Sequence, residues 1–389
     1  MTSAEWIADP GGLEDLCNAL LKEPAYALDT EFHRERTYYP HLALLQVAFP
    51  GRLVLVDPLD LDLAPLAPVL SSDAVFVAHA SEQDLEVLLR ACNALPTTLF
   101  DTQVAAGFLG FSSPSLSTLV DQLLHVKLPK GDRLTNWTRR PLTDAQRDYA
   151  ASDVVHLLEI RELIVAQLEK DGRLEWAEQE CAVQLQRAAA VSDPTTAWWR
   201  LKETRTLRGK SRCVAQEVAQ WREHRAMALD IPTRFVLSDM AILGIAHRPP
   251  ASARELRDIR GLEGRPLKGD AVEELLAAVR RGKELDESQL RLPQRDDLDP
   301  ALRPAVALVS AWIAQLARDV RIDASLLATR ADLHALLRGD RRGRLSHGWR
   351  SHLLGEPIRR LVDGEAAVAF DGKGDLVVEK RSRQPITGE

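Results

Sequence analysis

The sequence predicts an α/β domain with a mixed β-sheet at its N-terminal end, followed by a helical region that occupies the rest of the chain. Over roughly the first third of the 389 residues, short apolar runs of strand length alternate with helix-like segments. No strand pattern is expected between about residue 175 and about residue 363. A chain of this length also exceeds one ordinary hydrophobic core, so two or three domains are expected.

Three consecutive strands are expected to open the α/β domain. Tyr26–Leu28 leads into Asp29-Thr-Glu-Phe32, and a Pro50-Gly51 turn separates Leu42–Phe49 from Leu53–Val56. Such short connections favour antiparallel pairing. Further strands are expected at 74–78 and 99–100, and further helices from residue 81 and at about 102–110 and 115–124. Together these elements predict a mixed sheet.

The helical part begins with a capping box. Thr143 with Gln146 three residues later predicts the start of one long helix that runs to about Glu169. Asp286–Pro300, rich in Asp, Pro and Gln, is typical of a linker between two helical blocks. An offset of 91 residues aligns apolar positions of the two blocks, Trp221 with Trp312 among them. We interpret this as a divergent repeat, although two amphipathic helices can also align by chance.

Composition indicates a folded intracellular protein. The apolar fraction is 45% and the charged fraction is 28%, which excludes a disordered chain. The four cysteines lie far apart, so neither a zinc ribbon nor a disulfide framework is expected. The first ten residues lack the apolar core of a signal peptide, and the apolar stretch Pro304–Ala317 is too short to span a bilayer. The net charge of −7 decides nothing, because a site with several carboxylates contributes to it.

Three acidic signals are candidates for catalytic chemistry, and each has a structural alternative. Asp29 and Glu31 alternate on a strand, so both carboxylates point to one face, unless they simply mark a solvent-facing edge. Asp84 follows a buried strand, where it is either a functional carboxylate or a capping-box partner of Ser81. Tyr149 and Asp153 are four residues apart, which places them on one helix face. The alternative is a core tyrosine beside a solvated aspartate.

Taken together, D-x-E on a strand, Asp84 after a later strand and Y-x-x-x-D on a helix resemble the DEDD exonucleases in their tyrosine-containing branch. Further segments are similar to the ribonuclease D family, and the likeness extends over the whole chain. These segments are Leu28–Phe32, Arg36–Pro40, Phe100–Gln103, Arg140–Thr143, Tyr149–Val154 and, in the helical region, Ile231-Pro232, Ser238-Asp239 and Leu256–Leu262. Asn136 departs from the acidic residue expected before Trp137, which bears on local substrate contacts and not on the motif carboxylates.

The resemblance implies a ribonuclease H-like exonuclease domain followed by two all-α HRDC-type domains. It places the exonuclease domain at 1–175, a helical linker at 176–206, an HRDC domain at 207–285, a linker at 286–300, a second, diverged HRDC-like domain at 301–380 and a tail at 381–389. It also implies two Mg²⁺ or Mn²⁺ ions, which suit oxygen ligands. Asp29, Glu31 and Asp153 would hold one ion, Asp29 would bridge to the second, and Asp84 would support that second ion.

The implied activity is metal-dependent 3′→5′ exoribonuclease cleavage that releases nucleoside 5′-monophosphates. Structured RNA such as tRNA precursors would be the substrate, and a monomeric cytoplasmic enzyme is expected. Because a phenol is a poor base at neutral pH, Tyr149 is expected to orient the attacking water. His79, after its buried strand, is expected to be hydrogen-bonded in place and not a metal ligand.

Basic residues near aromatic rings are candidates for single-stranded RNA contact. One cluster lies beside Trp198 and Trp199, and another lies in the loop before Thr143. The residues singled out are Phe32, Lys130, Arg133, Arg200, Arg208 and Lys210, with Lys127, Arg139 and Arg140 in the same loop. Phe32 can equally be a core residue, and either basic cluster can be solvated surface.

Three other functions stay open from the residues alone. One is a DNA 3′→5′ exonuclease of the proofreading or repair type, since contacts to the 2′-hydroxyl are not visible in a sequence. Another is a catalytically inactive RNA-binding scaffold, which the complete acidic set disfavours. The third is a helical adaptor acting through residues 207–380, which would leave that acidic set unexplained.

Overall fold

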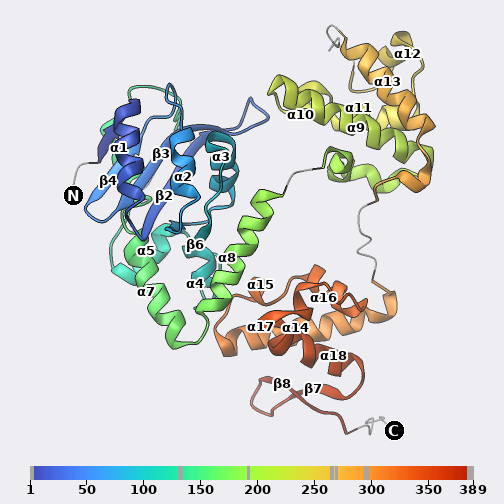
Figure 1. Cartoon of the computed structure of the whole chain (residues 1–389). Coiled ribbons are helices and arrows are strands. Elements are labelled where there is room, and N and C mark those ends of the chain that lie inside the picture. The colour runs from blue at the N-terminus through green and yellow to red at the C-terminus, as the bar shows by residue number, and fades with distance from the viewer. Residues whose placement is uncertain are drawn as a thin grey trace.

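The computed structural model describes residues 4–129, 135–190, 193–262, 267, 270–292 and 298–382. An α/β layer built on a six-stranded sheet forms the N-terminal part, and two helical blocks follow it (Figure 1). The exonuclease-like α/β layer and the helical blocks therefore occur in the predicted order.

The sheet has the strand order β1-β4-β3-β2-β5-β6. The predicted antiparallel trio is present as β2 (Ala25–His33), β3 (His41–Phe49) and β4 (Arg52–Val56). On either side of the trio the pairing is parallel, through β1 (Glu5–Ile7), β5 (Val75–Ala78) and β6 (Thr98–Asp101). The expectation that the trio comes first is wrong, because β1 precedes it. A strand of three residues is too short to show a period of two.

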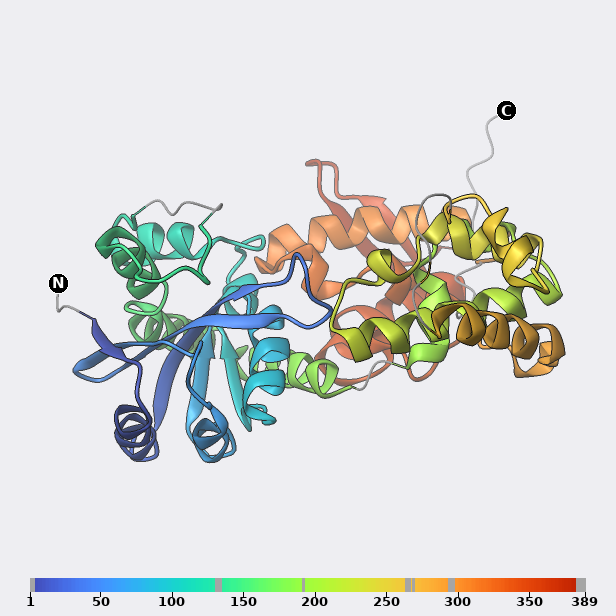
Figure 2. The same cartoon turned by 90° about the horizontal axis from the view of Figure 1, so that it is seen from above.

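Helices cover both faces of the sheet. One face packs against α1 (Pro10–Leu20), α2 (Ala67–Leu70) and α3 (Glu82–Cys92). The other packs against α4 (Thr102–Gly107), α5 (Leu116–Leu124), α6 (Asp144–Ser152) and α7 (Leu157–Lys170). Figure 2 shows the sheet from its edge, with the dark-blue and blue α1 and α2 below it and the green helices above. Residues 27, 29 and 31 of β2 belong to this second face.

The single long helix predicted from Thr143 to about Glu169 is wrong. The capping box of Thr143 and Gln146 is present, but α6 ends at Ser152 and α7 begins at Leu157. Between them the amides of Asp153 and Val154 bond to carbonyls only three residues back, so the chain tightens into turns. Ser152 contributes by donating its hydroxyl to the Tyr149 carbonyl at 2.6 Å. The break places Asp153 at the C-terminal cap of α6.

The first helical block contains α9 (Lys210–Leu229), α10 (Thr233–Val236), α11 (Asp239–His247), α12 (Ala253–Arg257) and α13 (Ala271–Glu284) around its own core. The second contains α14 (Arg303–Val320), α15 (Ala324–Leu327), α16 (Arg330–Leu337), α17 (Gly348–Arg350) and α18 (Glu356–Val362). An antiparallel hairpin of β7 (Ala366–Phe370) and β8 (Leu376–Lys380) ends the second block, so the expectation of an all-α block is wrong. Its turn is closed by Asp371, whose carboxylate accepts from the Lys373 and Asp375 amides.

The 91-residue offset corresponds to repeated local structure. It superposes the residue range of α10 on that of α15 and the start of α11 on the start of α16. Asp230 and Arg321, which end the first helix of each block, are both left-handed, with φ 47° and 50°. Trp221 and Trp312 are each 7% exposed. The two blocks therefore share a local helix–turn–helix arrangement, which agrees with the interpretation of a divergent repeat.

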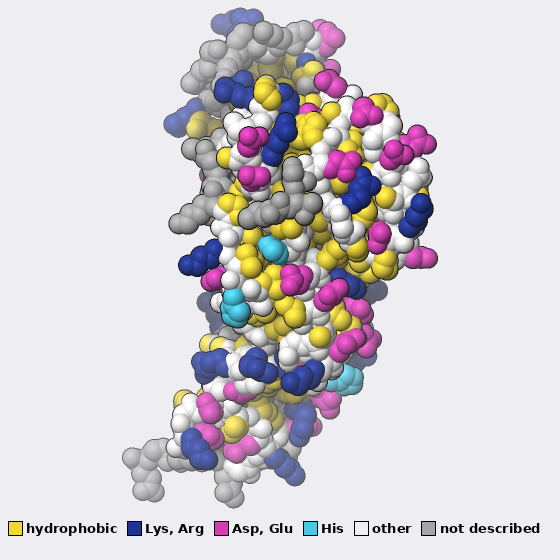
Figure 3. All heavy atoms as spheres, turned by 90° about the vertical axis from the view of Figure 1, so that its left-hand side faces the viewer, with side chains coloured by type: hydrophobic (Ala, Val, Ile, Leu, Met, Phe, Trp, Pro, Cys, Tyr) yellow, Lys and Arg dark blue, Asp and Glu magenta, His cyan; other side chains and the backbone are white. Residues whose placement is uncertain are grey.

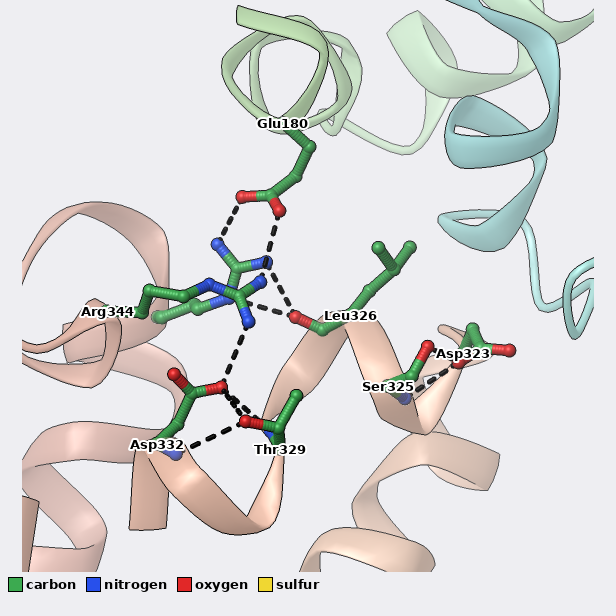
Figure 4. A network of polar contacts seen from close by, with 8 residues as sticks. Glu180, Asp323, Ser325, Leu326, Thr329, Asp332 and Arg344 are labelled. Atoms are coloured by element: carbon green, nitrogen blue, oxygen red, sulfur yellow. Dashed lines mark hydrogen bonds and ion pairs between the residues drawn. The ribbon is translucent and has the colours of Figure 1, made fainter. Parts of the chain in front are cut away.

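The second block shares a core with the α/β layer. Trp349 stacks on Trp176 of α8 (Leu174–Ala189), with ring centroids 4.8 Å apart, and also packs against Phe108 of α4. The Asp323 amide donates to the Gly107 carbonyl at 2.8 Å. A buried ion network adds to this contact, because Glu180 of α8 accepts from Arg344 at 3.1 Å and from Arg350 at 2.5 Å (Figure 4).

The first block meets the α/β layer mainly through polar contacts. The Asp230 carboxylate accepts from the backbone amides of Tyr38 and Tyr39 and lies 2.7 Å from His41 Nε2. Tyr38 donates its hydroxyl to Glu223 at 2.6 Å. Asp230 and Arg321 are equivalent in the repeat, and the Arg321 carbonyl accepts from Arg173 of the α/β layer. Both blocks thus present the same helix–helix corner to the α/β layer.

Among the described residues, one helical segment, Pro300–Val320, is long and apolar enough by composition to cross a membrane, with a mean hydropathy of 1.2. It extends beyond the Pro304–Ala317 stretch that was judged too short, although Val309, Trp312 and Ile313 within it are core residues of the second block. All four cysteines are buried free thiols, as expected.

Candidate active site

Asp29 and Glu31 lie on β2, which is the third strand from the β6 edge and has a partner on each side. The alternative of a solvent-facing edge strand is therefore wrong. Both carboxylates belong to the face covered by α6 and α7, and both side chains are partly buried. Glu31 pairs with Leu44 while Phe32 pairs with Leu42, so Ala43 is the extra residue of a β-bulge beside Glu31.

Asp84 lies in the first turn of α3, but it does not cap that helix. Ser81 makes no capping hydrogen bond, and its hydroxyl donates instead to Asp101 at 2.9 Å. The Asp84 carboxylate accepts from the Thr30 hydroxyl, between Asp29 and Glu31 in sequence. Asp84 is only 6% exposed. The capping-box interpretation is therefore wrong, and the carboxylate points to β2.

Tyr149 and Asp153 come from the end of α6. Their side chains face each other closely enough for each to shift the pKa of the other, in line with the predicted spacing of four. Tyr149 is partly buried and stacks on Trp137, with ring centroids 6.2 Å apart and an interplanar angle of 26°. Tyr149 is therefore not an ordinary core tyrosine, because its phenol faces a carboxylate.

The four carboxylates form one electrostatic group, here called the carboxylate cluster: Asp29, Glu31, Asp84 and Asp153. Burial raises the pKa of Glu31 to about 8, with Asp153 and Asp84 adding repulsion. Burial also raises the pKa of Asp84 to about 7 and that of Asp153 to about 7, and it raises the pKa of Asp29 well above its ordinary value. Carboxyl groups from separate elements thus converge on one place, and no cationic side chain of the described residues is among the causes of their pKa shifts.

This donor set fits divalent cations. It offers only oxygen ligands, which Mg²⁺ and Mn²⁺ prefer, and a cation would stabilise the ionised form of carboxylates whose pKa values burial raises. Among the residues the structure describes, no three Asp, Glu, His or Cys side chains form a preformed metal-binding group. The carboxylates are therefore brought near one another by the fold, but they are not closed into a finished ligand shell.

Asp101 is a residue that the sequence analysis did not single out. It is fully buried at the end of β6, and its carboxylate accepts from the amides of Ala80, Ser81 and Gln103 at 2.8–3.0 Å. It thereby fixes the turn that leads into α3 and Asp84. The sequence feature that could have identified Asp101 is its position between a buried strand and a helix, in the Phe100–Gln103 segment.

His79 has both ring nitrogens occupied, as expected of a histidine that is hydrogen-bonded in place. They lie 2.9 Å from the Thr102 hydroxyl and 3.1 Å from the Pro114 carbonyl oxygen. Burial lowers the pKa of His79.

The candidate RNA-contact residues do not form one basic surface. Arg200 pairs with the buried Glu223 at 2.7 Å, and Lys210 donates to the Leu285 carbonyl at 2.6 Å. Arg208 donates to the Leu207 carbonyl, and Phe32 is partly buried on β2. Lys130 and Arg133 lie outside the described residues. On the face shown in Figure 3, Lys and Arg side chains are interspersed with Asp and Glu.

Comparison with known proteins defines the class. Residues 4–169 match a family model described as 3′-5′ exonuclease, and residues 212–279 match one described as HRDC domain. The first match contains the whole carboxylate cluster and Tyr149. The chain is therefore a 3′→5′ exonuclease that carries an HRDC domain.

Whole-chain relatives refine this class. Ribonuclease D of Jannaschia sp. is 38% identical over 375 residues, which cover 93% of this chain and 96% of the relative. Ribonuclease D of Escherichia coli is 34% identical over 92% of this chain and 98% of its own length. A crystal structure of Escherichia coli RNase D, described as an exoribonuclease involved in structured RNA processing, superposes with a TM-score of 0.81 at 32% identity, covering 92% and 98% of the two chains. The chain belongs to the ribonuclease D family and is a metal-dependent 3′→5′ exoribonuclease.

Proposed function

We propose that the carboxylate cluster is the catalytic centre and that it holds two divalent ions, Mg²⁺ or Mn²⁺. Asp29, Glu31 and Asp153 hold one ion, and Asp29 with Asp84 holds the other. The observation that carries this proposal is that Asp29 and Glu31 lie within electrostatic reach of both Asp84 and Asp153, and that burial raises the pKa of all four carboxyl groups. When bound, the ions acidify the attacking water and neutralise charge on the attacking and leaving oxygens.

Tyr149 is proposed to orient the attacking water by hydrogen bonding. Burial and then the neighbouring carboxylates raise the pKa of its phenol to about 12, which favours a phenol that keeps its proton at neutral pH and acts by hydrogen bonding. The Asp153 carboxylate interacts with the phenol electrostatically. A protonated phenol held in this way can donate to, or accept from, a water molecule at the cluster.

RNA precursors with structured bodies, tRNA precursors among them, are the proposed substrates, shortened from their 3′ ends to release nucleoside 5′-monophosphates. This rests on the relative described as acting on structured RNA. We further propose that the enzyme is a cytoplasmic monomer. Phe32 and the exposed parts of Arg200, Arg208 and Lys210 are proposed RNA contacts, together with Lys130 and Arg133.

The division of the chain into functional units is also proposed. The exonuclease unit is 1–175, joined by 176–206 to an HRDC unit at 207–285, and 286–300 leads to a second, diverged HRDC unit at 301–380 before the tail at 381–389. The matched residues 4–169 and 212–279 support the first and third of these units. The shared helix–turn–helix and the matching left-handed Asp230 and Arg321 support the last.

Degradation of end-labelled oligonucleotides tests this function. RNA and a matched DNA, each labelled at the 5′ or the 3′ end, are incubated with Mg²⁺ or Mn²⁺, with EDTA, and with the Asp29→Ala variant. Mononucleotide release from the RNA 3′ end that both EDTA and the substitution abolish is the expected result. Faster digestion of DNA would favour a repair exonuclease, and binding without cleavage would favour an inactive scaffold.

A further inference from the structure

The β-bulge beside Glu31 is closed by an arginine from a distant loop. Arg140 donates from Nη2 to the carbonyl of Ala43, the extra residue of the bulge, at 2.6 Å. Its Nε and Nη2 also reach both carboxylate oxygens of Asp57, at 2.5 and 2.7 Å. This bidentate fork is the geometry in which arginine binds a carboxylate most strongly. These hydrogen bonds occupy the Arg140 guanidinium, so Arg140 is no longer a candidate for the RNA contact considered for this loop.

The same guanidinium holds the loop that carries Trp137. Nη1 donates to the Trp137 carbonyl at 2.7 Å and to the Arg139 carbonyl at 2.9 Å. Asn136 tightens this turn, because its side-chain oxygen accepts from the Thr138 amide and hydroxyl. One side chain thus ties together β3, the end of β4 and the backbone of the loop.

Trp137 connects the loop that Arg140 fixes to the active site. Its ring is only 9% exposed and belongs to a small apolar cluster on the catalytic face of the sheet, with Leu44 and Ala150. It stacks on Tyr149 at 6.2 Å. A ring so covered offers little surface to an RNA base, whereas an offset-stacked neighbour restricts the rotation of the phenol.

We propose that Trp137 and Arg140 are positioning residues for Tyr149: Arg140 fixes the loop, and the Trp137 ring fixes the phenol against the carboxylate cluster. The inference rests on the proposed role of Tyr149. It gives a role to the arginine that satisfies the carbonyl of the bulged Ala43. Neither residue touches the substrate in this scheme, so their loss affects turnover through the tyrosine.

A double-mutant cycle tests the proposal. We measure kcat and KM of the full chain on a 5′-labelled RNA oligonucleotide with Mn²⁺, for Trp137→Leu, Tyr149→Phe and the double variant. Misplacing a catalytic group lowers kcat by roughly 10- to 100-fold, and Trp137→Leu is expected in this range with KM nearly unchanged. In the Tyr149→Phe background, Trp137→Leu should change kcat by less than about 2-fold, because the hydroxyl it positions is already gone.

Conservative variants and a matched control separate positioning from folding. Trp137→Phe keeps an aromatic ring on Tyr149 and should restore most of the lost kcat, whereas Arg140→Lys loses the fork to Asp57 and should resemble Trp137→Leu. Trp221→Leu removes an equally buried tryptophan from the separate core of the first helical block and controls for lost stability. Folded fraction and Mn²⁺ affinity are measured for every variant.

Three results would overturn the inference. Multiplicative losses in the double variant would show that Trp137 acts independently of Tyr149. A rise in KM with kcat unchanged would make Trp137 an RNA contact. Full activity of Tyr149→Phe would remove the proposed role of the tyrosine itself, and the positioning scheme with it. The first two leave the proposed function intact, whereas the third does not.

Discussion

The strongest prediction about how the second helical block is held to the α/β layer concerns Glu180 of α8. Its carboxylate is the partner of Arg350, which is 5% exposed, and of Arg344, which also pairs with Asp332 at 3.0 Å. Glu180→Gln keeps the shape but removes the charge. Arg344 then retains Asp332, whereas Arg350 retains the Leu326 carbonyl, at 2.7 and 2.9 Å, and the face of the Trp349 ring, but no anionic partner bonded to it directly.

The expected cost follows from the buried cation that is left. Removing one partner of a buried ion pair lowers the free energy of unfolding by about 3–5 kcal/mol, and the carbonyl contacts that Arg350 keeps place this variant near the lower value. Burial already lowers the pKa of Arg350, and Glu180 is the main group that opposes this effect. At roughly 2–4 °C per kcal/mol, a loss of about 3 kcal/mol lowers Tm by roughly 6–12 °C.

Urea unfolding followed by near-ultraviolet circular dichroism measures this loss, because the Trp176–Trp349 stack lies at the same interface. Glu178→Gln, an exposed neighbour on α8, is the matched control and should stay within about 0.5 kcal/mol of the unsubstituted chain. A loss below about 1 kcal/mol for Glu180→Gln would refute the reasoning. The second block would then be held by its apolar core alone.

Four further outcomes are expected. In EDTA, Tm should fall as the pH rises from about 4 through about 8, because carboxyl groups with raised pKa values are protonated in the folded state and lose that stability on ionising. Mn²⁺ should restore Tm most at high pH, and Asp84→Asn should make Tm depend less steeply on pH. A Tm that rises over this pH range in EDTA would contradict the expected direction. Tyr149→Phe should leave measurable nuclease activity and Asp29→Ala nearly none, whereas equal losses would make the tyrosine as essential as the carboxylate. Asp101→Asn should cost about 1–3 kcal/mol in urea unfolding, since its new amide cannot accept from every donor around it, and unchanged stability would argue against its role. Asp230→Ala should expose the first helical block to faster limited proteolysis without lowering kcat on a short RNA, and equal cleavage rates would show that the polar contacts do not hold it.

The candidate catalytic residues could be predicted from the sequence because the spacings within their motifs are local. A period of two places Asp29 with Glu31 and a spacing of four places Tyr149 with Asp153, whatever the rest of the chain does. Contacts between distant segments were not predictable in the same way. Ser81 with Asp84 fitted a capping box, but Ser81 bonds to Asp101 and Asp84 to Thr30, 54 residues away.

Elements were misjudged where local preference is weak or tertiary contacts decide. The helix expected through Asp153 breaks there without a proline or glycine, but the run from Ser152 to His156 consists of residues with weak helical propensity. The short β1 and the terminal hairpin carry too few residues to show alternation, and the hairpin is signalled chiefly by Gly372 and Gly374 at its turn. The fork from Arg140 to Asp57 spans 83 residues, which no local pattern reveals.

The shared core of the second block changes what counts as one folding unit. Apolar side chains from α4, α7 and α8 and from α14, α15 and α17 form one continuous cluster, while the first block has a core of its own. Along the chain, the first block therefore lies between two parts of a single discontinuous domain, as an insertion does. A fragment cut at residue 175 would leave Phe108 without its aromatic partners Trp176 and Trp349. The α/β layer and the second block thus pack as one unit built from two separate chain segments.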